Sequence, residues 1–313
     1  MDSKKIRKSI GRFFGWLGLI FSSLIIKVVP GHCVLSFARA VGGAAFVFSR
    51  KHKKIALDSL AIAFGKEKSR QEMEGIAREC FTFLAKSAFE LISLLDKPEL
   101  IKEQVTFSGR ENLDAALSKG YGVILVSAHF GNFPLMLARI RLEGYKVSGI
   151  MRPMRDTRVE NFFAKKRDRF GIKTIYSVPR RVCVEETLKT LRGNELIFIP
   201  LDQNFGTGGV FVDFFGKKAA TATGPVVLAL RTKSSIIPAF IVRQKDDTHR
   251  IIFEKAMELE EGKTGQDTVV INIQKLTGII ESYIRKYPAE WGWIHRRWKS
   301  RPNLEEEHLK GGA

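Results

Sequence analysis

The sequence predicts an α/β fold in which helices flank a mostly parallel central sheet, preceded by an apolar helical segment that associates with a membrane. Three observations predict this fold class: a basic and apolar N-terminus, helical periodicity over residues 55–105, and short β-branched runs that alternate with helical patterns from about residue 120. The 313 residues suffice for one sizeable core. We therefore divide the chain into a membrane-anchoring segment at 1–48, a main domain at 49–302 and a polar tail at 303–313.

The N-terminal segment combines positive charge with apolar runs. Lysine and arginine are frequent over residues 4–12, and an apolar run follows at 13–26. This run is shorter than the roughly 20 residues that a spanning helix needs, and no small-residue site for signal cleavage follows it. With a second apolar run at 33–48, ahead of basic residues at 50–54, the pattern predicts a hairpin lying in one leaflet, its basic ends at anionic headgroups. Two buried helices of a soluble core, or one spanning helix extended through Lys27, remain alternatives.

The main domain begins with helices and continues as an α/β alternation. Over residues 55–105 apolar side chains recur at amphipathic helical spacing, and no chemical motif is visible there. Beyond them, short β-branched runs alternate with helical patterns, which indicates parallel strands joined by crossover helices. The predicted strands cover residues 123–126, 147–150, 196–199 and 236–242, and the predicted helices cover about 133–143, 156–170, 182–192 and 225–233. Ligands of such sheets bind beyond the carboxyl ends of the strands, so we expect the site there.

Charge and cysteine content narrow the possible partners. Fifty-two lysines and arginines against 33 acidic residues leave a formal charge of +19. The partners that fit are anionic: phospholipid, phosphorylated glycolipid, an acidic carrier protein or nucleic acid. No nucleic-acid motif occurs, and lipid explains the apolar N-terminus better, so nucleic acid is disfavoured. The three cysteines are far apart, which supports neither a disulfide framework nor a zinc site and fits a reducing, cytoplasm-facing location.

The first candidate site residue is His129, which follows the first predicted strand in the segment Ser-Ala-His-Phe-Gly-Asn-Phe at 127–133. Asn132 is a suitable N-cap for the next helix, and Pro134 suits its first turn. A histidine at such a turn can be structural or catalytic. This block resembles the first signature of the lipid A acyltransferases and of the wider lysophospholipid acyltransferase superfamily. In that signature a histidine and an acidic residue five positions later form a general-base pair.

The acidic position of that pair is occupied here by Pro134. A carboxylate behind a catalytic histidine fixes its tautomer and stabilises the imidazolium, and proline can do neither. Three explanations remain open: another carboxylate substitutes, a backbone carbonyl orients the ring, or the activity is lost or altered. Asp202 is the candidate substitute because it also lies at the end of a predicted strand.

Further blocks extend the resemblance over about residues 50–302, so 49–302 is interpreted as an acyltransferase catalytic domain. These blocks are Met-Arg-Pro at 151–153, Asp-Gln at 202–203, an aromatic stretch at 209–216 followed by 220–225, and a closing Trp-rich block at 291–299.

Three catalytic candidates follow from these blocks: His129, Asp202 and Arg152, of which Arg152 suits a phosphate or a developing oxyanion, with a plain surface arginine as the alternative. Phenylalanines of the aromatic stretch suit an acyl-chain groove or ordinary core, and the threonines lie at the positive start of a predicted helix. The candidate substrate contacts are Asn132, Arg169, Gln203, Phe211, Phe214, Phe215, Thr221, Thr223, His295, Arg296 and Arg297.

The resemblance implies an O-acyltransferase that moves a fatty acyl chain from an acyl carrier protein, or from coenzyme A, to a hydroxyl of a lipid A precursor or related glycolipid. His129 takes the hydroxyl proton in this scheme, without a cofactor, at the cytoplasmic face of the bacterial inner membrane. A lipid acyltransferase of altered specificity, or a weakened lipid-binding relative, is the alternative that Pro134 raises. The absence of a Gly-x-Ser-x-Gly elbow disfavours a serine hydrolase, and the histidines show no metal-ligand spacing.

Overall fold

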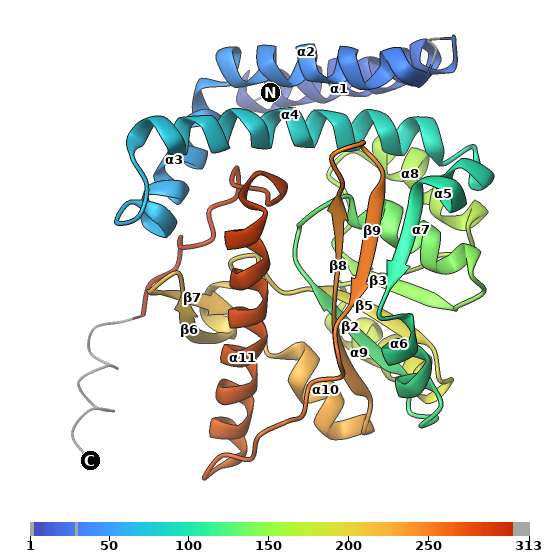
Figure 1. Cartoon of the computed structure of the whole chain (residues 1–313), viewed down its shortest axis with the longest axis vertical. Coiled ribbons are helices and arrows are strands. Elements are labelled where there is room, and N and C mark those ends of the chain that lie inside the picture. Colours follow the sequence, from blue (N-terminus) through green and yellow to red (C-terminus); the bar gives the residue numbers. More distant parts are fainter. Residues whose placement is uncertain (1–2, 29–30, 303–313) are drawn as a thin grey trace.

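The computed structural model describes residues 3–28 and 31–302, so the predicted polar tail at 303–313 lies outside the described residues. The strands of its central sheet are β1 (Val105–Ser108), β2 (Val123–Ser127), β3 (Val147–Met151), β4 (Lys173–Tyr176), β5 (Leu196–Pro200), β8 (Ser235–Arg243) and β9 (His249–Phe253). They lie in the order β1-β9-β8-β2-β5-β3-β4 (Figure 1). Every neighbouring pair is parallel except β8 and β9. The predicted α/β fold with a mostly parallel sheet is confirmed.

Helices cover both faces of this sheet. The helices of the sheet region are α5 (Pro98–Gln104), α6 (Arg110–Leu117), α7 (Phe133–Leu142), α8 (Thr157–Arg169), α9 (Arg180–Arg192), α10 (Gly224–Thr232) and α11 (Gly265–Lys286). Within β2, Ile124 and Val126 join the core formed with α9, α10 and α11, whereas Val123 and Leu125 join the core formed with α5, α6 and α7. Successive side chains of a strand point to opposite faces, so a strand between two helical layers must be apolar throughout.

Several strands leave no recognisable pattern in the sequence. β1 and β4 have four residues each, and each buries a single side chain, so neither forms an apolar run. β6 (Val210–Phe214) and β7 (Lys217–Thr221) form a separate antiparallel hairpin, which packs against α11. Short, half-exposed strands carry too weak a periodicity to be recognised from sequence.

The chain begins with α1 (Ser3–Val28), α2 (Gly31–Phe48), α3 (Arg50–Phe64) and α4 (Arg70–Leu94). α2 lies along α4 above the sheet (Figure 1). Phe46 of α2 meets Phe81 of α4 edge to face, and both belong to the main core. The second half of the predicted anchoring segment is therefore packed onto the main domain.

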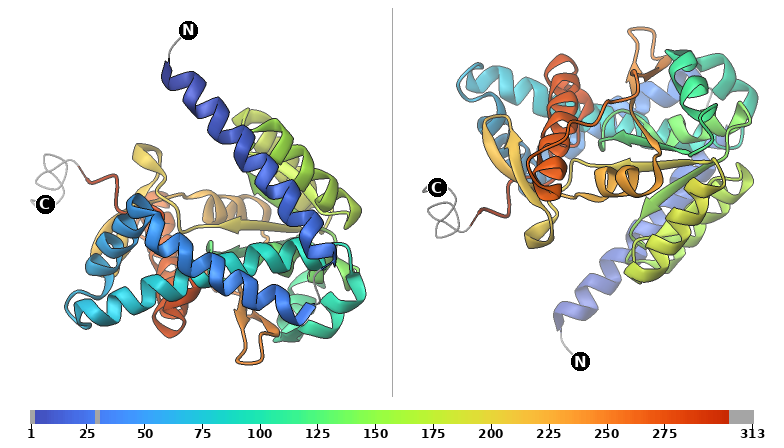
Figure 2. Two further views of the ribbon diagram at one scale, coloured as in Figure 1. Left: turned by 90° about the horizontal axis from the view of Figure 1, so that it is seen from above. Right: turned by 90° about the horizontal axis from the view of Figure 1, so that it is seen from below.

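α1 leaves the body at an angle to α2, and its first turns project outward (Figure 2). The guanidinium of Arg158 on α8 contacts the rings of Phe13 and Trp16 at 5.4 and 5.3 Å. Among the described residues no single helix is long and apolar enough to cross a bilayer, and only the pair Cys33–Phe48 and Arg50–Phe64, bent by 87°, meets that criterion when joined.

Candidate active site

His129 and Asp202 are brought together by the pairing of β2 with β5. The two strands are parallel neighbours in register, with Ser127 opposite Pro200 at their carboxyl ends. His129 stands two residues beyond the end of β2, and Asp202 stands two residues beyond the end of β5. The two side chains therefore emerge side by side at the edge where α/β sheets bind ligands.

The histidine and the aspartate are hydrogen-bonded. Nδ1 of His129 lies 2.8 Å from Oδ1 of Asp202, and the indole N–H of Trp291 donates to the other carboxylate oxygen, Oδ2, at 2.7 Å. The Asp202 side chain is 1% exposed and the His129 side chain 27%. An ionised carboxylate accepts only, so it fixes the proton of the neutral imidazole on Nδ1 and leaves the lone pair of Nε2 directed outward.

Gln203 lies at the outward nitrogen of His129. Its side-chain nitrogen is 3.1 Å from Nε2 of His129. With Nε2 unprotonated, the amide N–H of Gln203 donates to it, in the place that an acceptor hydroxyl needs for proton transfer. Gln203 is exposed, so its amide is placed to hydrogen-bond that hydroxyl.

The electrostatics of the pair suit a general base. Burial alone lowers the pKa of His129, but the charge and hydrogen bond of Asp202 outweigh it, and the pKa is raised above 6.5. Burial alone raises the pKa of Asp202, but the charge and hydrogen bond of His129 and the bond from Trp291 outweigh it and lower the pKa to about 2. Asp202 therefore stays ionised at any physiological pH, and His129 is a stronger base than a free imidazole.

A second imidazole faces the first. The ring of His295 lies 5.6 Å from the ring of His129, and the ring of Phe133 packs edge-on against His129 at 5.4 Å. Burial, followed by the charge of His129, lowers the pKa of His295, so this ring is neutral near pH 7. A neutral imidazole beside the base can hydrogen-bond a substrate without competing for the proton.

The turn that carries His129 is fastened by backbone hydrogen bonds. The N–H of Gly131 donates to the carbonyl of Glu290 at 2.9 Å, and the N–H of Gly292 donates to the carbonyl of His129 at 3.3 Å. Gly131 has φ +59°, and a Cβ there would collide with the carbonyl oxygen of Ile241. Glycine is therefore required at this point of the turn.

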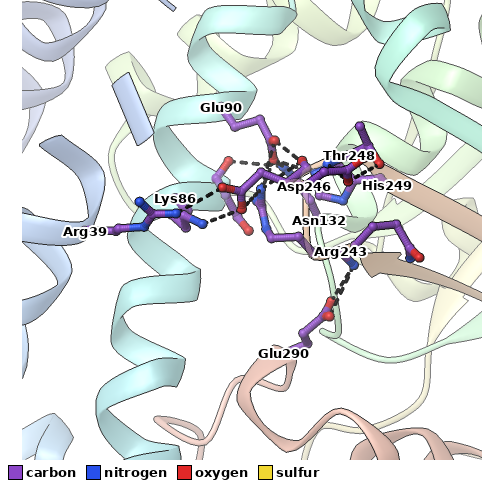
Figure 3. Close-up of polar contacts among 12 residues, drawn as sticks. Arg39, Lys86, Glu90, Asn132, Arg243, Asp246, Thr248, His249 and Glu290 are labelled. Carbon is purple, nitrogen blue, oxygen red and sulfur yellow. Dashed lines mark hydrogen bonds and ion pairs between the residues drawn. The ribbon is translucent and has the colours of Figure 1, made fainter. Parts of the chain in front are cut away.

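A buried polar network centred on Glu90 of α4 lies behind this turn (Figure 3). Glu90 accepts hydrogen bonds from Arg243 at 2.8 Å, from the side-chain amide of Asn132 at 2.9 Å, and from Nε2 of His249 at 2.9 Å. The loop between β8 and β9 is also linked to the N-terminal helices. Its Asp247 pairs with Lys86 of α4 and, at 3.2 Å, with Arg39 of α2.

The network also includes Glu290, the residue whose carbonyl accepts the hydrogen bond from Gly131 of the turn. The backbone N–H of Arg243 lies 3.2 Å from both carboxylate oxygens of Glu290, whose pKa burial raises to about 7. Burial alone raises the pKa of Glu90, but His249 and Arg243 outweigh it and hold that pKa below its usual value. Glu90 is thus an ionised, buried anion that joins α4, the β8–β9 hairpin and the turn after His129.

Replacing Glu90 with glutamine is expected to lower the free energy of unfolding by about 3–5 kcal/mol, because the buried guanidinium of Arg243 loses its nearest anion. Urea unfolding followed by tryptophan fluorescence measures this loss. Glu99→Gln, at an exposed position of α5, is the matched control and should change the midpoint little. Equal midpoints for the two variants would show that the network contributes nothing to stability.

The structure corrects several predicted substrate contacts, because their side chains are buried. Arg297 is 0% exposed and donates to the carbonyl of Gln203 at 3.1 Å and to the hydroxyl of Thr221, itself 0% exposed. Arg297 thereby joins the loop after β5 to Thr221 at the end of β7. Phe214 and Phe215, 1% and 6% exposed, pack among Trp291, Trp293 and Trp298 in the core instead of lining an open groove.

Asn132 and Thr223 stand at the N-cap positions of α7 and α10, but neither side chain forms a cap hydrogen bond, which corrects the expectation for Asn132. Asn132 is 2% exposed and bonded to Glu90, so it supports the turn and does not face a substrate. The predicted substrate contact at Arg169 is also corrected, because Arg169 is the last residue of α8 and pairs with Asp96 at 2.6 Å. A crossover helix runs back against the strands, so only its first turn lies near the carboxyl edge.

The remaining candidates keep accessible positions. Arg152 is exposed just beyond β3, at the same edge of the sheet as His129. Phe211 is half-buried on β6, and Arg296 is exposed in the closing block. Within residues 3–28 and 31–302, no group of three or more histidine, cysteine or acidic side chains is arranged to hold a metal ion.

Two supporting residues were missed. Trp291 belongs to the closing block quoted above, yet only its contact with Asp202 distinguishes it from a core tryptophan. Glu90 carried one sequence signal, since it is an acidic residue between Phe89 and Leu91 in an otherwise apolar stretch of helix. A carboxylate on a buried helical face needs partners, but sequence does not name them.

Comparison with known proteins identifies the family. The family model of the bacterial lipid A biosynthesis acyltransferases matches residues 2–300. The chain belongs to this family. It is therefore an acyltransferase, as the resemblance implied.

Individual family members resemble the chain along nearly its whole length. It is 26% identical over 294 residues to the lipid A biosynthesis palmitoleoyltransferase of Escherichia coli (strain K12), covering 92% of this chain and 91% of the relative. It is 23% identical over 290 residues to the lipid A biosynthesis lauroyltransferase of the same organism, covering 92% of each. A phosphatidylinositol mannoside acyltransferase of Mycobacterium tuberculosis (strain CDC 1551 / Oshkosh) is 23% identical over 191 residues, 61% of this chain and 58% of the relative.

Proposed function

We propose that this protein transfers a fatty acyl chain from a thioester donor to a hydroxyl of a lipid A precursor, with His129 as the general base. The observation that carries this proposal is the 2.8 Å hydrogen bond between Nδ1 of His129 and the buried carboxylate of Asp202. The acidic residue that Pro134 displaces is thereby replaced from a neighbouring strand. Because the histidine has a carboxylate partner, the general-base pair is complete, which favours an active enzyme over a lipid-binding relative without activity.

The geometry of the site supports direct transfer of the acyl chain from donor to acceptor. Nε2 of His129 accepts the proton of the acceptor hydroxyl as the hydroxyl oxygen attacks the thioester carbonyl carbon. The carbonyl oxygen becomes an oxyanion, and the imidazolium is stabilised by Asp202. The C–S bond then breaks, the new ester forms, and the leaving thiolate takes the proton from His129. No acyl group is attached to the enzyme at any stage.

Two further residues have assigned tasks in this proposal. Gln203 orients the acceptor hydroxyl, since its amide lies 3.1 Å from Nε2 of His129. Arg152, exposed at the same edge of the sheet, binds a phosphate or stabilises the oxyanion. Because His129 only takes a proton from the hydroxyl and passes it to the thiolate, positioning of the two lipids at the membrane surface supplies much of the rate.

The donor in this proposal is acyl carrier protein or, as the second choice, acyl-coenzyme A. Both are acidic, and the formal charge of +19 favours their approach. The partial similarity to a phosphatidylinositol mannoside acyltransferase supports another glycolipid as the alternative acceptor.

The decisive experiment uses the purified protein with each donor and a set of lipid A precursors, and mass spectrometry of the products. A product heavier by one acyl chain is expected with at least one precursor. Lipid A from a deletion strain should lack the same chain, which identifies both its length and its position. Tight lipid binding without transfer from any donor would support the lipid-binding alternative instead.

We further propose that α1 binds the cytoplasmic face of the inner membrane without crossing it. Four large apolar residues recur every three or four positions on this helix and are 39–65% exposed: Phe13, Leu17, Phe21 and Leu24. Such a stripe lies on one face of a helix, which suits insertion to the level of the acyl chains.

The double substitution Phe21→Glu and Leu24→Glu is expected to weaken binding to anionic vesicles at least about tenfold. It removes two apolar side chains that would be buried in the membrane. Vesicle flotation measures the change. Val227→Glu with Leu230→Glu on α10, where the side chains are 46% and 49% exposed, is the matched control and should float like the wild type. Equal flotation of the α1 variant and the wild type would exclude α1 as the membrane contact.

A further inference from the structure

A groove distinct from the His129 pair lies between α3 and the closing block. Its volume is about 530 Å³, and Figure 1 shows α3 beside the last part of the described chain. Its cations come from both walls, three from α3 and two exposed ones from the closing block: Arg50, Lys51, Lys54, Arg296 and Lys299. Two segments far apart in sequence thus direct positive charge into one space.

Most of this charge is not neutralised by the described part of the protein. Lys54 pairs with Asp58 at 3.4 Å, and both side chains are largely exposed, so the pair is weak. No ion pair to any described residue is formed by Arg50, Lys51, Arg296 or Lys299. A concave surface with several uncompensated cations attracts an anion with more than one negative charge.

The start of α3 adds to this attraction. Its first turn contains Arg50 and Lys51 and no acidic residue, and Ser49 at the N-cap forms no side-chain cap hydrogen bond. Helix N-termini are stabilised by anions and destabilised by cations. A bound anion at this end would relieve the unfavourable placement of the two cations.

Apolar side chains adjoin the cations. Ile55, Ile62 and Trp298 line the same groove. Val47 and Phe48, just before α3, are 60% and 82% exposed. Cations beside exposed apolar side chains are typical of the level where lipid headgroups meet acyl chains, whereas the docking face of a soluble acidic protein requires no such apolar neighbours.

The groove is connected to the catalytic pair through His295. Ser59, which lines the groove, donates its hydroxyl proton to the carbonyl of His295 at 3.4 Å. The ring of His295 lies on the other side, 5.6 Å from the ring of His129. The groove and the catalytic pair therefore each adjoin a residue that contacts His295, Ser59 in the groove and His129 in the pair.

We propose that this groove binds a phosphate group of the lipid acceptor while the acceptor hydroxyl lies at His129. The inference rests on the proposed acyl transfer and assigns the phosphorylated end of the acceptor to Arg50 and Arg296. Recognition of that phosphate selects a phosphorylated lipid over an otherwise identical neutral one.

The test compares the wild type with the double variant Arg50→Ala and Arg296→Ala, using a phosphorylated lipid acceptor and the same acceptor after enzymatic dephosphorylation. The KM of the variant for the phosphorylated acceptor is expected to rise about tenfold, the loss of charge-assisted contacts with one phosphate. Its KM for the dephosphorylated acceptor should equal that of the wild type. The control, Arg192→Ala with Arg231→Ala, removes the same charge from a smaller cavity beside Gly120, at the amino end of β2.

Each other outcome overturns the assignment. An equal effect on both acceptors excludes phosphate recognition, and a raised KM for the acyl donor assigns the groove to the acidic carrier. Weaker vesicle binding, with unchanged acceptor KM in detergent micelles, assigns it to bulk anionic phospholipid.

A binding measurement separates this inference from the proposed function. If no acceptor is acylated, the proposed function fails, but the groove is still tested by titrating both lipids in micelles. The wild type is then expected to bind the phosphorylated lipid about tenfold more tightly than the double variant does, and equal affinities would overturn the proposal.

Discussion

Replacing His129 with alanine is expected to lower kcat by about 10²- to 10⁴-fold, because the acceptor hydroxyl loses the base that takes its proton. Binding of both lipids should change little, since the His129 side chain is 27% exposed and its removal leaves Asp202 bonded to Trp291. Single-turnover transfer of a labelled acyl chain by the purified variant measures the loss.

Two controls give this result its meaning. His52→Ala, at an exposed position of α3, should transfer at the rate of the wild type. Removal of His129 leaves the buried Asp202 carboxylate with Trp291 as its side-chain partner, so urea unfolding of His129→Ala is measured as well, and the rates are compared where the variant is folded. Full transfer activity in a folded His129→Ala variant would refute the proposed base.

The substitution Asp202→Asn is expected to reduce the rate by up to about 10⁴-fold. Losses of this size occur when the aspartate beside a catalytic histidine is replaced by asparagine, which has the same shape but no charge. The amide no longer fixes the proton on Nδ1 and no longer stabilises the imidazolium. Because Asp202 raises the pKa of His129, its removal lowers that pKa.

The direction of the pH dependence follows from this shift. A general base works in its neutral form, so activity rises with pH through the pKa of His129. In Asp202→Asn the acidic limb of the kcat/KM profile should therefore move to lower pH, while the maximum falls. An unchanged acidic limb would show that Asp202 does not tune His129. Asp168→Asn, at an exposed position of α8, is the control and should retain both the rate and the profile.

The sequence alone predicted the parts of the fold whose periodicity is strong. The four predicted strands are β2, β3, β5 and β8, each of which has at least three consecutive buried residues, and the predicted crossover helices are α7, α8, α9 and α10. Burial on both faces of a sheet demands continuous apolar runs, which are visible in one dimension. The four-residue strands β1 and β4 left no such run.

The family was also determined by sequence, since the family model matches residues 2–300, and His129 was singled out by its place after a strand. Only the tertiary structure decided which side chains meet. Strand order and register placed Asp202 beside His129 across 73 positions of sequence, and core packing turned Arg297, Thr221 and Asn132 inward. Hydrogen-bond partners and burial depend on how distant segments pack, and local sequence patterns carry no record of that packing.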